Sequence, residues 1–124
     1  MKDENSMAPV DLETRTDFAL RIIKLFAALP KTTEAQVPGK QLLRCGTSAG
    51  AHYREAKRAK STLDFIDKIE GALQELDESC YWLTLLERSE IMSARRLRPL
   101  QIEASELIKI FVTVVKRAKE KLKK

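Results

Sequence analysis

The sequence contains few of the residues from which catalytic and metal sites are built. It has one histidine, His52, and two cysteines, Cys45 and Cys80, which form no CxxC pair. A zinc site needs a cluster of such ligands, and a Cys/His or Ser/His/Asp site would have to use His52. Cys45 and His52 lie about two helical turns apart, roughly 10 Å along a helix axis. These absences predict a protein that is not an enzyme and that holds no metal or cofactor.

Motifs for phosphate and di-iron sites are absent as well. Gly46 and Gly50 lie inside a helical pattern and lack the lysine of a P-loop. A di-iron bundle needs Glu-x-x-His pairs on facing helices, and the sequence has none. The acidic residues of the third helical stretch are therefore interpreted as a solvated or subunit-facing surface: Asp64, Asp67, Glu70, Glu75, Asp77 and Glu78.

Long apolar runs are missing too. No stretch approaches the ~20 residues of a membrane span. The segment Met1–Val10 carries Asp3 and Glu4 and has no apolar core, unlike a signal peptide. We therefore expect no membrane contact, a cytoplasmic location and a flexible tail over residues 1–10. In a reducing compartment, both cysteines are expected to be small buried residues rather than a disulfide.

Glycine and proline are scarce, at four each, in a chain that is 44% hydrophobic and 33% charged. Apolar residues recur at the helical period in four stretches, of which the first has Asp11 as its expected N-cap and ends at Pro30. Short connections between amphipathic helices favour antiparallel neighbours. The sequence predicts an all-α, antiparallel up-down-up-down four-helix bundle, a single domain over residues 11–124, with helices at Asp11–Leu29, Pro38–Lys60, Thr62–Arg88 and Ser93–Leu122.

Local signals predict where the later helices begin. Pro38 suits the first position of the second helix, after a loop over Lys31–Val37. Ser61 with Asp64 three residues later resembles a capping box at the start of the third helix. Pro99 leaves two alternatives for the fourth helix, a separate first turn or a kink.

The inner face of the second helix is made of unusually small residues. Gly46 and Gly50 stand about one turn apart, and each weakens a solvated helix by ~1 kcal/mol relative to alanine. Such residues are expected where another backbone approaches closely. A ligand-binding notch is the alternative. The stripe comprises Cys45, Gly46, Ala49, Gly50 and Ala56, with Leu42 and Tyr53.

Charge is segregated by helix within a net charge of +5. Residues Pro38–Lys60 contain six basic residues and one acidic residue, whereas Thr62–Arg88 contain two basic and seven acidic residues. Residues Ser93–Lys124 contain ten basic and three acidic residues. An acidic third helix therefore stands between two basic ones in the sequence.

Three interpretations of the basic stretches stay open. They contact the phosphates of RNA or DNA by releasing counterions, without reading sequence. Alternatively, they meet the acidic helix of a neighbouring subunit in a head-to-tail ring, or they complement helix dipoles and solubilise the chain. The candidate nucleic-acid-binding residues are Arg54, Lys57, Arg58, Lys60, Arg95, Arg96, Arg98, Lys116, Arg117, Lys119 and Lys121.

Several motifs resemble one bacterial family. They are LPKT at 29–32, GKQLLRCGTSAGAHYREA at 39–56, RAKS at 58–61, DFIDK at 64–68, DESCYWL at 77–83, EASEL at 103–107 and IF at 110–111. Their order and spacing resemble the four-helix-bundle family of 23S rRNA intervening-sequence proteins. The chain departs from the family pattern at Cys45, Ala49 and His52, where Ser, a branched aliphatic residue and Asn are usual.

This resemblance implies a cytoplasmic bacterial protein, of a kind sometimes encoded inside insertions in ribosomal RNA genes. The family is also similar to the accessory variability determinant of diversity-generating retroelements. Those relatives assemble as barrel-like pentamers and bind nucleic acid and a reverse transcriptase. The resemblance therefore implies a homopentamer, contact with RNA or DNA, and a protein partner such as a reverse transcriptase. A scaffold that binds another protein, with no nucleic-acid role, is the alternative function.

Overall fold

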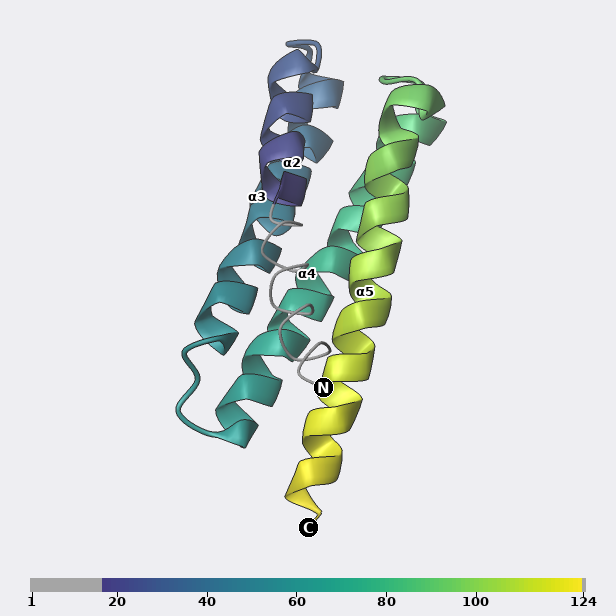
Figure 1. Ribbon diagram of the computed structural model, residues 1–124. Coiled ribbons are helices and arrows are strands. Elements are labelled where there is room, and N and C mark those ends of the chain that lie inside the picture. Colours follow the sequence, from purple (N-terminus) through teal and green to yellow (C-terminus); the bar gives the residue numbers. More distant parts are fainter. Residues whose placement is uncertain (1–16, 124) are drawn as a thin grey trace.

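The computed structural model describes residues 17–123, and this part of the chain forms an antiparallel four-helix bundle (Figure 1). The helices α2 and α4 run in one direction, and α3 and α5 run in the opposite direction. The predicted fold class is therefore confirmed. The expected tail over residues 1–10 and the expected N-cap Asp11 lie outside the described residues. The helices are α2 (Asp17–Ala28), α3 (Thr33–Ala56), α4 (Thr62–Arg88) and α5 (Ala94–Leu122).

The core runs along the bundle axis, with α4 packed against both α3 and α5. The shorter α2 lies against the upper part of α3 in Figure 1. Each fully buried large side chain contributes roughly 1.5–3 kcal/mol relative to an exposed one. None of the described helices is long and apolar enough to cross a membrane. The largest core residues come from all four helices and include Ile22, Leu42, Ile69, Leu76, Leu83, Leu86 and Leu97.

The predicted bounds of the second helix are wrong at both ends. The helix α3 begins at Thr33 rather than at Pro38, so most of the predicted loop Lys31–Val37 is helical. It ends at Ala56 rather than at Lys60, and residues 57–61 form the turn that leads into α4.

Burial explains the early start of α3. The Thr32 carbonyl accepts a backbone hydrogen bond from Gln36 at 2.9 Å, and Ala35 in this first turn is completely buried. Pro38 then occupies the second turn of the helix. There it removes only the hydrogen bond that the Glu34 carbonyl would have accepted.

Pro99 does not divide the fourth helix. The helix α5 runs unbroken to Leu122, and the Ser93 hydroxyl caps its start by accepting a hydrogen bond from the Arg96 N–H at 3.4 Å. The alternative of a separate first turn is therefore wrong. Pro99 stands at the same distance from its N-cap as Pro38 does in α3.

The glycines that face α2 differ in part from the predicted pair. A Cβ added at Gly46 would lie 3.0 Å from Cγ1 of Ile22, and one added at Gly39 would lie 2.5 Å from Cδ1 of Leu29. At Gly50, no described atom other than the helix's own neighbouring backbone lies within 4 Å of that position. The predicted approach of another backbone is therefore wrong at both positions: a side chain packs closely on Gly46, and nothing packs on Gly50.

The start of α4 is held by reciprocal hydrogen bonds, as the sequence predicts. The Ser61 hydroxyl accepts a hydrogen bond from the Asp64 N–H at 3.0 Å, and the Asp64 carboxylate accepts one from the Lys60 N–H at 3.1 Å. The ammonium of Lys68 donates to the same carboxylate at 3.1 Å. These two hydrogen bonds lower the pKa of Asp64 from its usual 3.8, and the bond from the Lys68 ammonium has the larger effect.

Replacing Asp64 with asparagine is expected to destabilise the protein at neutral pH but not in acid. A carboxylate whose pKa is lowered by folding stabilises the native state above its unfolded pKa, and this contribution disappears as the pH falls through its folded pKa. The difference in unfolding free energy between D64N and the native chain should therefore shrink between about pH 5 and about pH 2. Urea unfolding followed by circular dichroism measures it.

The matched control is Ser61→Ala, which removes the cap but keeps the carboxylate. This variant should lower the free energy of unfolding by about 1 kcal/mol. It should still lose stability as the pH falls, because the Asp64 carboxylate is kept. A D64N difference that stays constant with pH would contradict the assigned role of the Asp64 charge.

Candidate nucleic-acid interface

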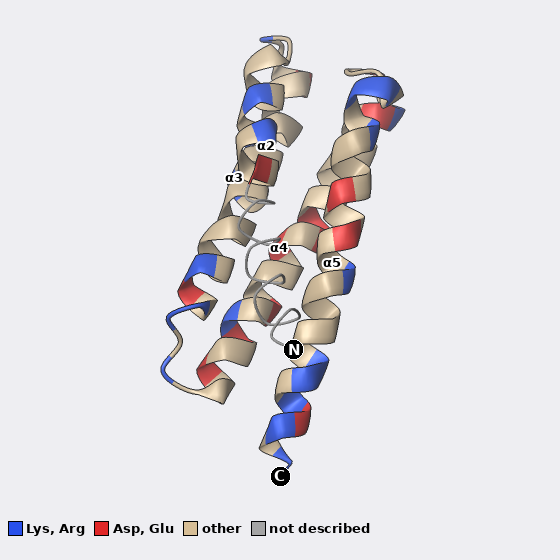
Figure 2. Cartoon of the chain, viewed as in Figure 1, with Lys and Arg blue, Asp and Glu red and all other residues tan. Residues whose placement is uncertain are grey.

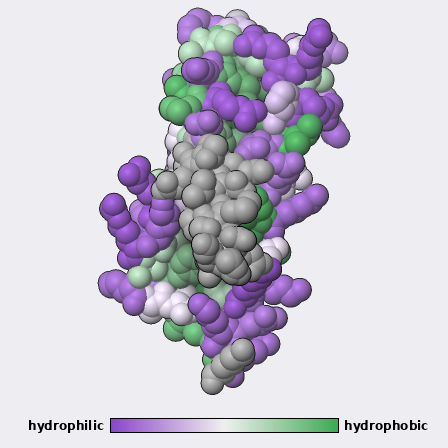
Figure 3. Space-filling model, in the orientation of Figure 1, coloured by the Kyte–Doolittle hydropathy of each residue, from purple (hydrophilic) through white to green (hydrophobic). Residues whose placement is uncertain are grey.

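The bundle topology brings two predicted basic segments to one end of the molecule. Both α3 and α5 run toward this end, where the α3–α4 loop and the tip of α5 flank the first turns of α4 (Figure 2). Hydrophilic side chains gather there in Figure 3. We call this surface the basic end and define it by residues that are all exposed: Arg54, Lys57, Arg58, Lys60, Lys116, Arg117, Lys119 and Lys121.

A buried aromatic pair connects the two basic segments. The rings of Tyr53 in α3 and Phe111 in α5 stack with centroids 5.7 Å apart and an interplanar angle of 18°. Both rings are nearly inaccessible, with 7% and 4% of their surfaces exposed. Lys57 Nζ lies 5.7 Å from the Tyr53 ring centroid, within the range of a cation–π contact. Lys57 therefore covers the core as well as carrying charge.

Carboxylates at the basic end neutralise some of its cations. Lys119 Nζ lies 3.1 Å from Glu70 of α4, and Lys68 pairs with Asp64 within α4. Five other cations form no ion pair with any residue in the part of the chain that the structure describes. These five are Arg54, Arg58, Lys60, Lys116 and Lys121.

The structure does not place the remaining predicted residues with them. Arg95, Arg96 and Arg98 lie in the first turns of α5, at the opposite end of the bundle (Figures 1 and 2). Arg98 also forms an ion pair with Glu87 at 3.5 Å. These three candidates therefore lie apart from the basic end, because α5 is long enough to separate its own two ends by the length of the bundle.

Several carboxylates of the acidic helix α4 form ion pairs with cations of the same chain. Arg44 of α3 pairs with Glu78 at 3.2 Å and with Glu75 at 3.7 Å. Glu70 and Glu87 pair with α5 as described above. Several carboxylates of α4 therefore pair with cations of the neighbouring helices α3 and α5 within the same chain.

Sequence reasoning missed the packing of the single histidine. A Cβ added at Gly71 of α4 would lie 3.1 Å from the His52 ring, so the glycine provides the space for that ring. His52 Nε2 lies 3.9 Å from Glu75, and Nδ1 lies 3.8 Å from Glu55. Nothing in a single sequence shows that His52 of α3 and Gly71 of α4 face each other.

The two free thiols differ in burial: Cys45 is buried, as expected, whereas Cys80 is half-buried. Burial raises the pKa of Cys45, whose Sγ lies 3.3 Å from the Ser79 hydroxyl. Burial also raises the pKa of Cys80. Both thiols are therefore protonated at neutral pH, unlike a reactive thiolate. Among the described residues, no group of three or more His, Cys, Asp or Glu side chains is placed to hold a metal ion.

Comparison with known proteins places this bundle in a family. Residues 12–113 match the model of the 23S rRNA-intervening sequence protein family. The chain belongs to that family. A comparison with curated proteins finds no match. A solved structure from Bacteroides thetaiotaomicron VPI-5482, a protein of unknown function from the S23 ribosomal protein family, is 37% identical, with a TM-score of 0.80 over 85% of this chain and 98% of that chain.

The structure shows the surroundings of Cys45, Ala49 and His52, the three positions singled out in the sequence. Cys45 and Ala49 are buried, with 0% and 4% of their surfaces exposed, so small apolar residues fit these positions. His52 is half-buried beside Gly71 rather than in the core.

Proposed function

We propose that this chain is a non-enzymatic, cytoplasmic helical protein that assembles with copies of itself and contacts RNA or DNA without sequence preference through its basic end. One observation carries the proposal. Five exposed cations from α3, the α3–α4 loop and α5 gather at one end, and none forms an ion pair with a described residue.

The chemistry of the basic end favours phosphates over bases. Lysine and arginine near a nucleic acid release its condensed counterions, which favours binding whatever the sequence. Reading single-stranded bases needs exposed aromatic rings for stacking. Of the rings near the basic end, Tyr53 and Phe111 are buried against each other, and Phe65 in the first turn of α4 is half-buried and packed against the core. The contact we propose is therefore electrostatic and strongly dependent on salt.

Family membership supports an RNA setting and a ring-shaped assembly. The family name refers to ribosomal RNA, and the similar structure is described as a member of a ribosomal protein family. By similarity to the accessory variability determinant, we propose a homopentamer and a protein partner such as a reverse transcriptase. Large apolar side chains exposed on α4 and α5 support contacts with other chains: Leu63, Tyr81, Leu85, Ile102 and Val112.

The second candidate is a protein-binding scaffold with no nucleic-acid role. The observation that favours it is the same exposed apolar set, in which Tyr81 and Leu85 lie one turn apart on α4 with 57% and 36% of their surfaces exposed. A protein partner that covers this surface would bind with little dependence on salt, whereas phosphate contacts weaken as salt rises.

A salt titration separates the two functions. Labelled RNA and DNA are titrated with the native chain at several salt concentrations, and light scattering on the same samples gives the subunit count. We expect both nucleic acids to bind at low salt, with log affinity falling linearly against log salt by about 0.9 for each phosphate contact on duplex DNA. Absence of binding at low salt, or binding that ignores salt, would reject the nucleic-acid role.

A further inference from the structure

We propose that the seam between α2 and α5 is a binding site for a small organic anion, meaning an anionic head group carried on an apolar body. A pocket of about 270 Å³ opens in this seam, at the end of the bundle opposite the basic end. The site is thus separate from the proposed nucleic-acid surface. Its lining comprises Arg21, Lys24, Leu25, Met92, Arg96, Pro99 and Leu100.

The floor of the pocket is apolar. Leu25, Met92 and Leu100 are buried, with 6%, 7% and 4% of their surfaces exposed, and all three belong to the core. Pro99 adds an exposed apolar edge. A ligand's apolar body in this pocket would be removed from water, which is favourable in proportion to the apolar area buried. A bare inorganic anion would leave this floor uncovered.

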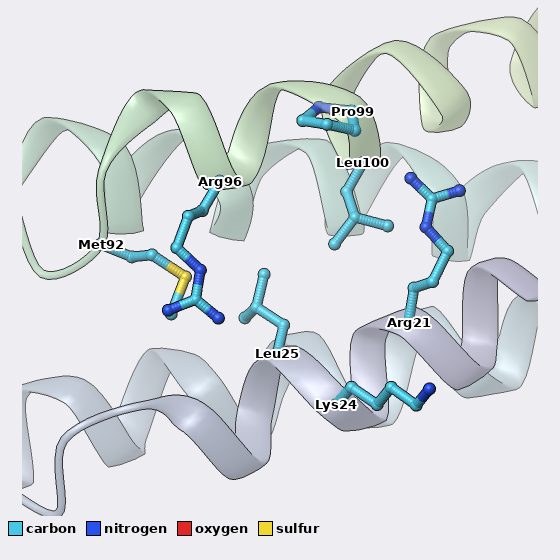
Figure 4. Close-up of a pocket in the computed structure, with 7 residues that line it drawn as sticks. All are labelled: Arg21, Lys24, Leu25, Met92, Arg96, Pro99 and Leu100. Atoms are coloured by element: carbon cyan, nitrogen blue, oxygen red, sulfur yellow. The ribbon is translucent and has the colours of Figure 1, made fainter.

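Three cations surround the floor. In Figure 4 the Arg96 side chain extends from α5 toward α2, and the Arg21 side chain extends from α2 toward α5, so their guanidinium groups stand on either side of Leu25 and Leu100. No acidic residue lines the pocket. Arg21, Lys24 and Arg96 also form no ion pair with any residue between positions 17 and 123.

The charges and the size together define the ligand class. Several positive charges beside an apolar wall produce a strong positive potential in the pocket. A guanidinium group binds a carboxylate or phosphate with two parallel hydrogen bonds. The pocket volume of about 270 Å³ lies just below the roughly 300–1,000 Å³ range of sites for drug-sized ligands, so the ligand must be small. A short aliphatic or aromatic carboxylate, or a phosphate monoester on a small apolar group, fits these limits.

The test uses the full chain and the fluorescent probe anilinonaphthalene sulfonate, with octanoate and inorganic phosphate as competitors. We expect saturable probe binding with one site per chain, displacement by octanoate, and no displacement by inorganic phosphate at the same concentration and ionic strength. Arg21→Gln and Arg96→Gln should each weaken binding about tenfold or more, because each removes a hydrogen bond between charged groups.

The matched control is Arg95→Gln, which removes an exposed cation beside Arg96 that does not line the pocket. It should leave the affinity unchanged. Native affinity in both R21Q and R96Q, or equal displacement by phosphate and octanoate, would overturn the proposal. Amide NMR shifts localise the probe: the largest shifts are expected at Leu25 and Arg96, and shifts confined to the exposed face around Tyr81 would also overturn it.

Discussion

Replacing Arg58, Lys60, Lys116 and Lys121 together with glutamine is expected to weaken RNA and DNA binding roughly a thousandfold at about 0.1 M salt. All four side chains are exposed at the basic end and form no ion pair with a described residue. The slope of log affinity against log salt should become shallower by about 0.9 for each duplex phosphate that the variant no longer neutralises. Fluorescence anisotropy with labelled nucleic acids at two salt concentrations measures both quantities.

The choice of these four residues follows from the surroundings of their neighbours. Lys57 packs over Tyr53 and Lys119 pairs with Glu70, so replacing either would alter helix packing as well as charge. Glutamine has nearly the helix propensity of lysine and arginine, so the variant should keep its fold. Circular dichroism checks that the helical content is unchanged.

A second variant removes the same amount of charge from the other end of the bundle. Lys31, Lys40, Arg88 and Arg95 are exposed there, and their replacement by glutamine should leave the affinity close to that of the native chain. Equal weakening in both variants would show that net charge, rather than the basic end, drives binding. Light scattering must give the same mass for both, because loss of assembly in the basic-end variant alone would make that end a subunit interface.

Gly46→Leu is expected to lower the free energy of unfolding by about 1–3 kcal/mol, although leucine is the better helix former. A Cβ at this position would lie 3.0 Å from Cγ1 and 3.1 Å from Cγ2 of Ile22, whose side chain is completely buried. The larger side chain can be accommodated only if the Ile22 side chain shifts or α2 moves away from α3. Urea unfolding followed by circular dichroism gives the change in stability.

Gly50 supplies the matched control for this prediction. No described atom outside its own stretch of helix lies near its Cβ position, so Gly50→Leu should be neutral or stabilise the chain by up to about 1 kcal/mol. Ile22→Ala by itself should cost about 2–5 kcal/mol, and in combination with Gly46→Leu the two losses should be less than additive. Strict additivity would show that the two side chains do not compete for the same space.

How well each boundary could be predicted depends on where its cause lies in the chain. The start of α4 agrees with the sequence prediction because Ser61 and Asp64 cap the helix within their own turn. The predicted start of α3 is wrong because a proline is commonest at the first helical position, whereas the buried Ala35 places Pro38 in the second turn. That burial is a tertiary contact, which no local pattern reveals.

The candidate interface was predictable only in part. Charge counts identify the basic segments, and antiparallel topology then requires the ends of α3 and α5 to lie together and the start of α5 to lie apart. The pairing of Lys119 with Glu70 and of Arg98 with Glu87 depends on how α4 and α5 are rotated against each other. In the same way, the rotation of α2 against α5 decides that Arg21 and Arg96 face one pocket.

By itself, the sequence determined the helical fold, the separation of charge between helices, and the family, because helical periodicity and motif order are properties of the chain read in one dimension. Only the tertiary structure decided which cations stay unpaired at the basic end, which glycine meets α2, and where a pocket opens between α2 and α5. These features depend on the axial register and rotation of the packed helices. That register and rotation are set by contacts between side chains that lie far apart in the sequence.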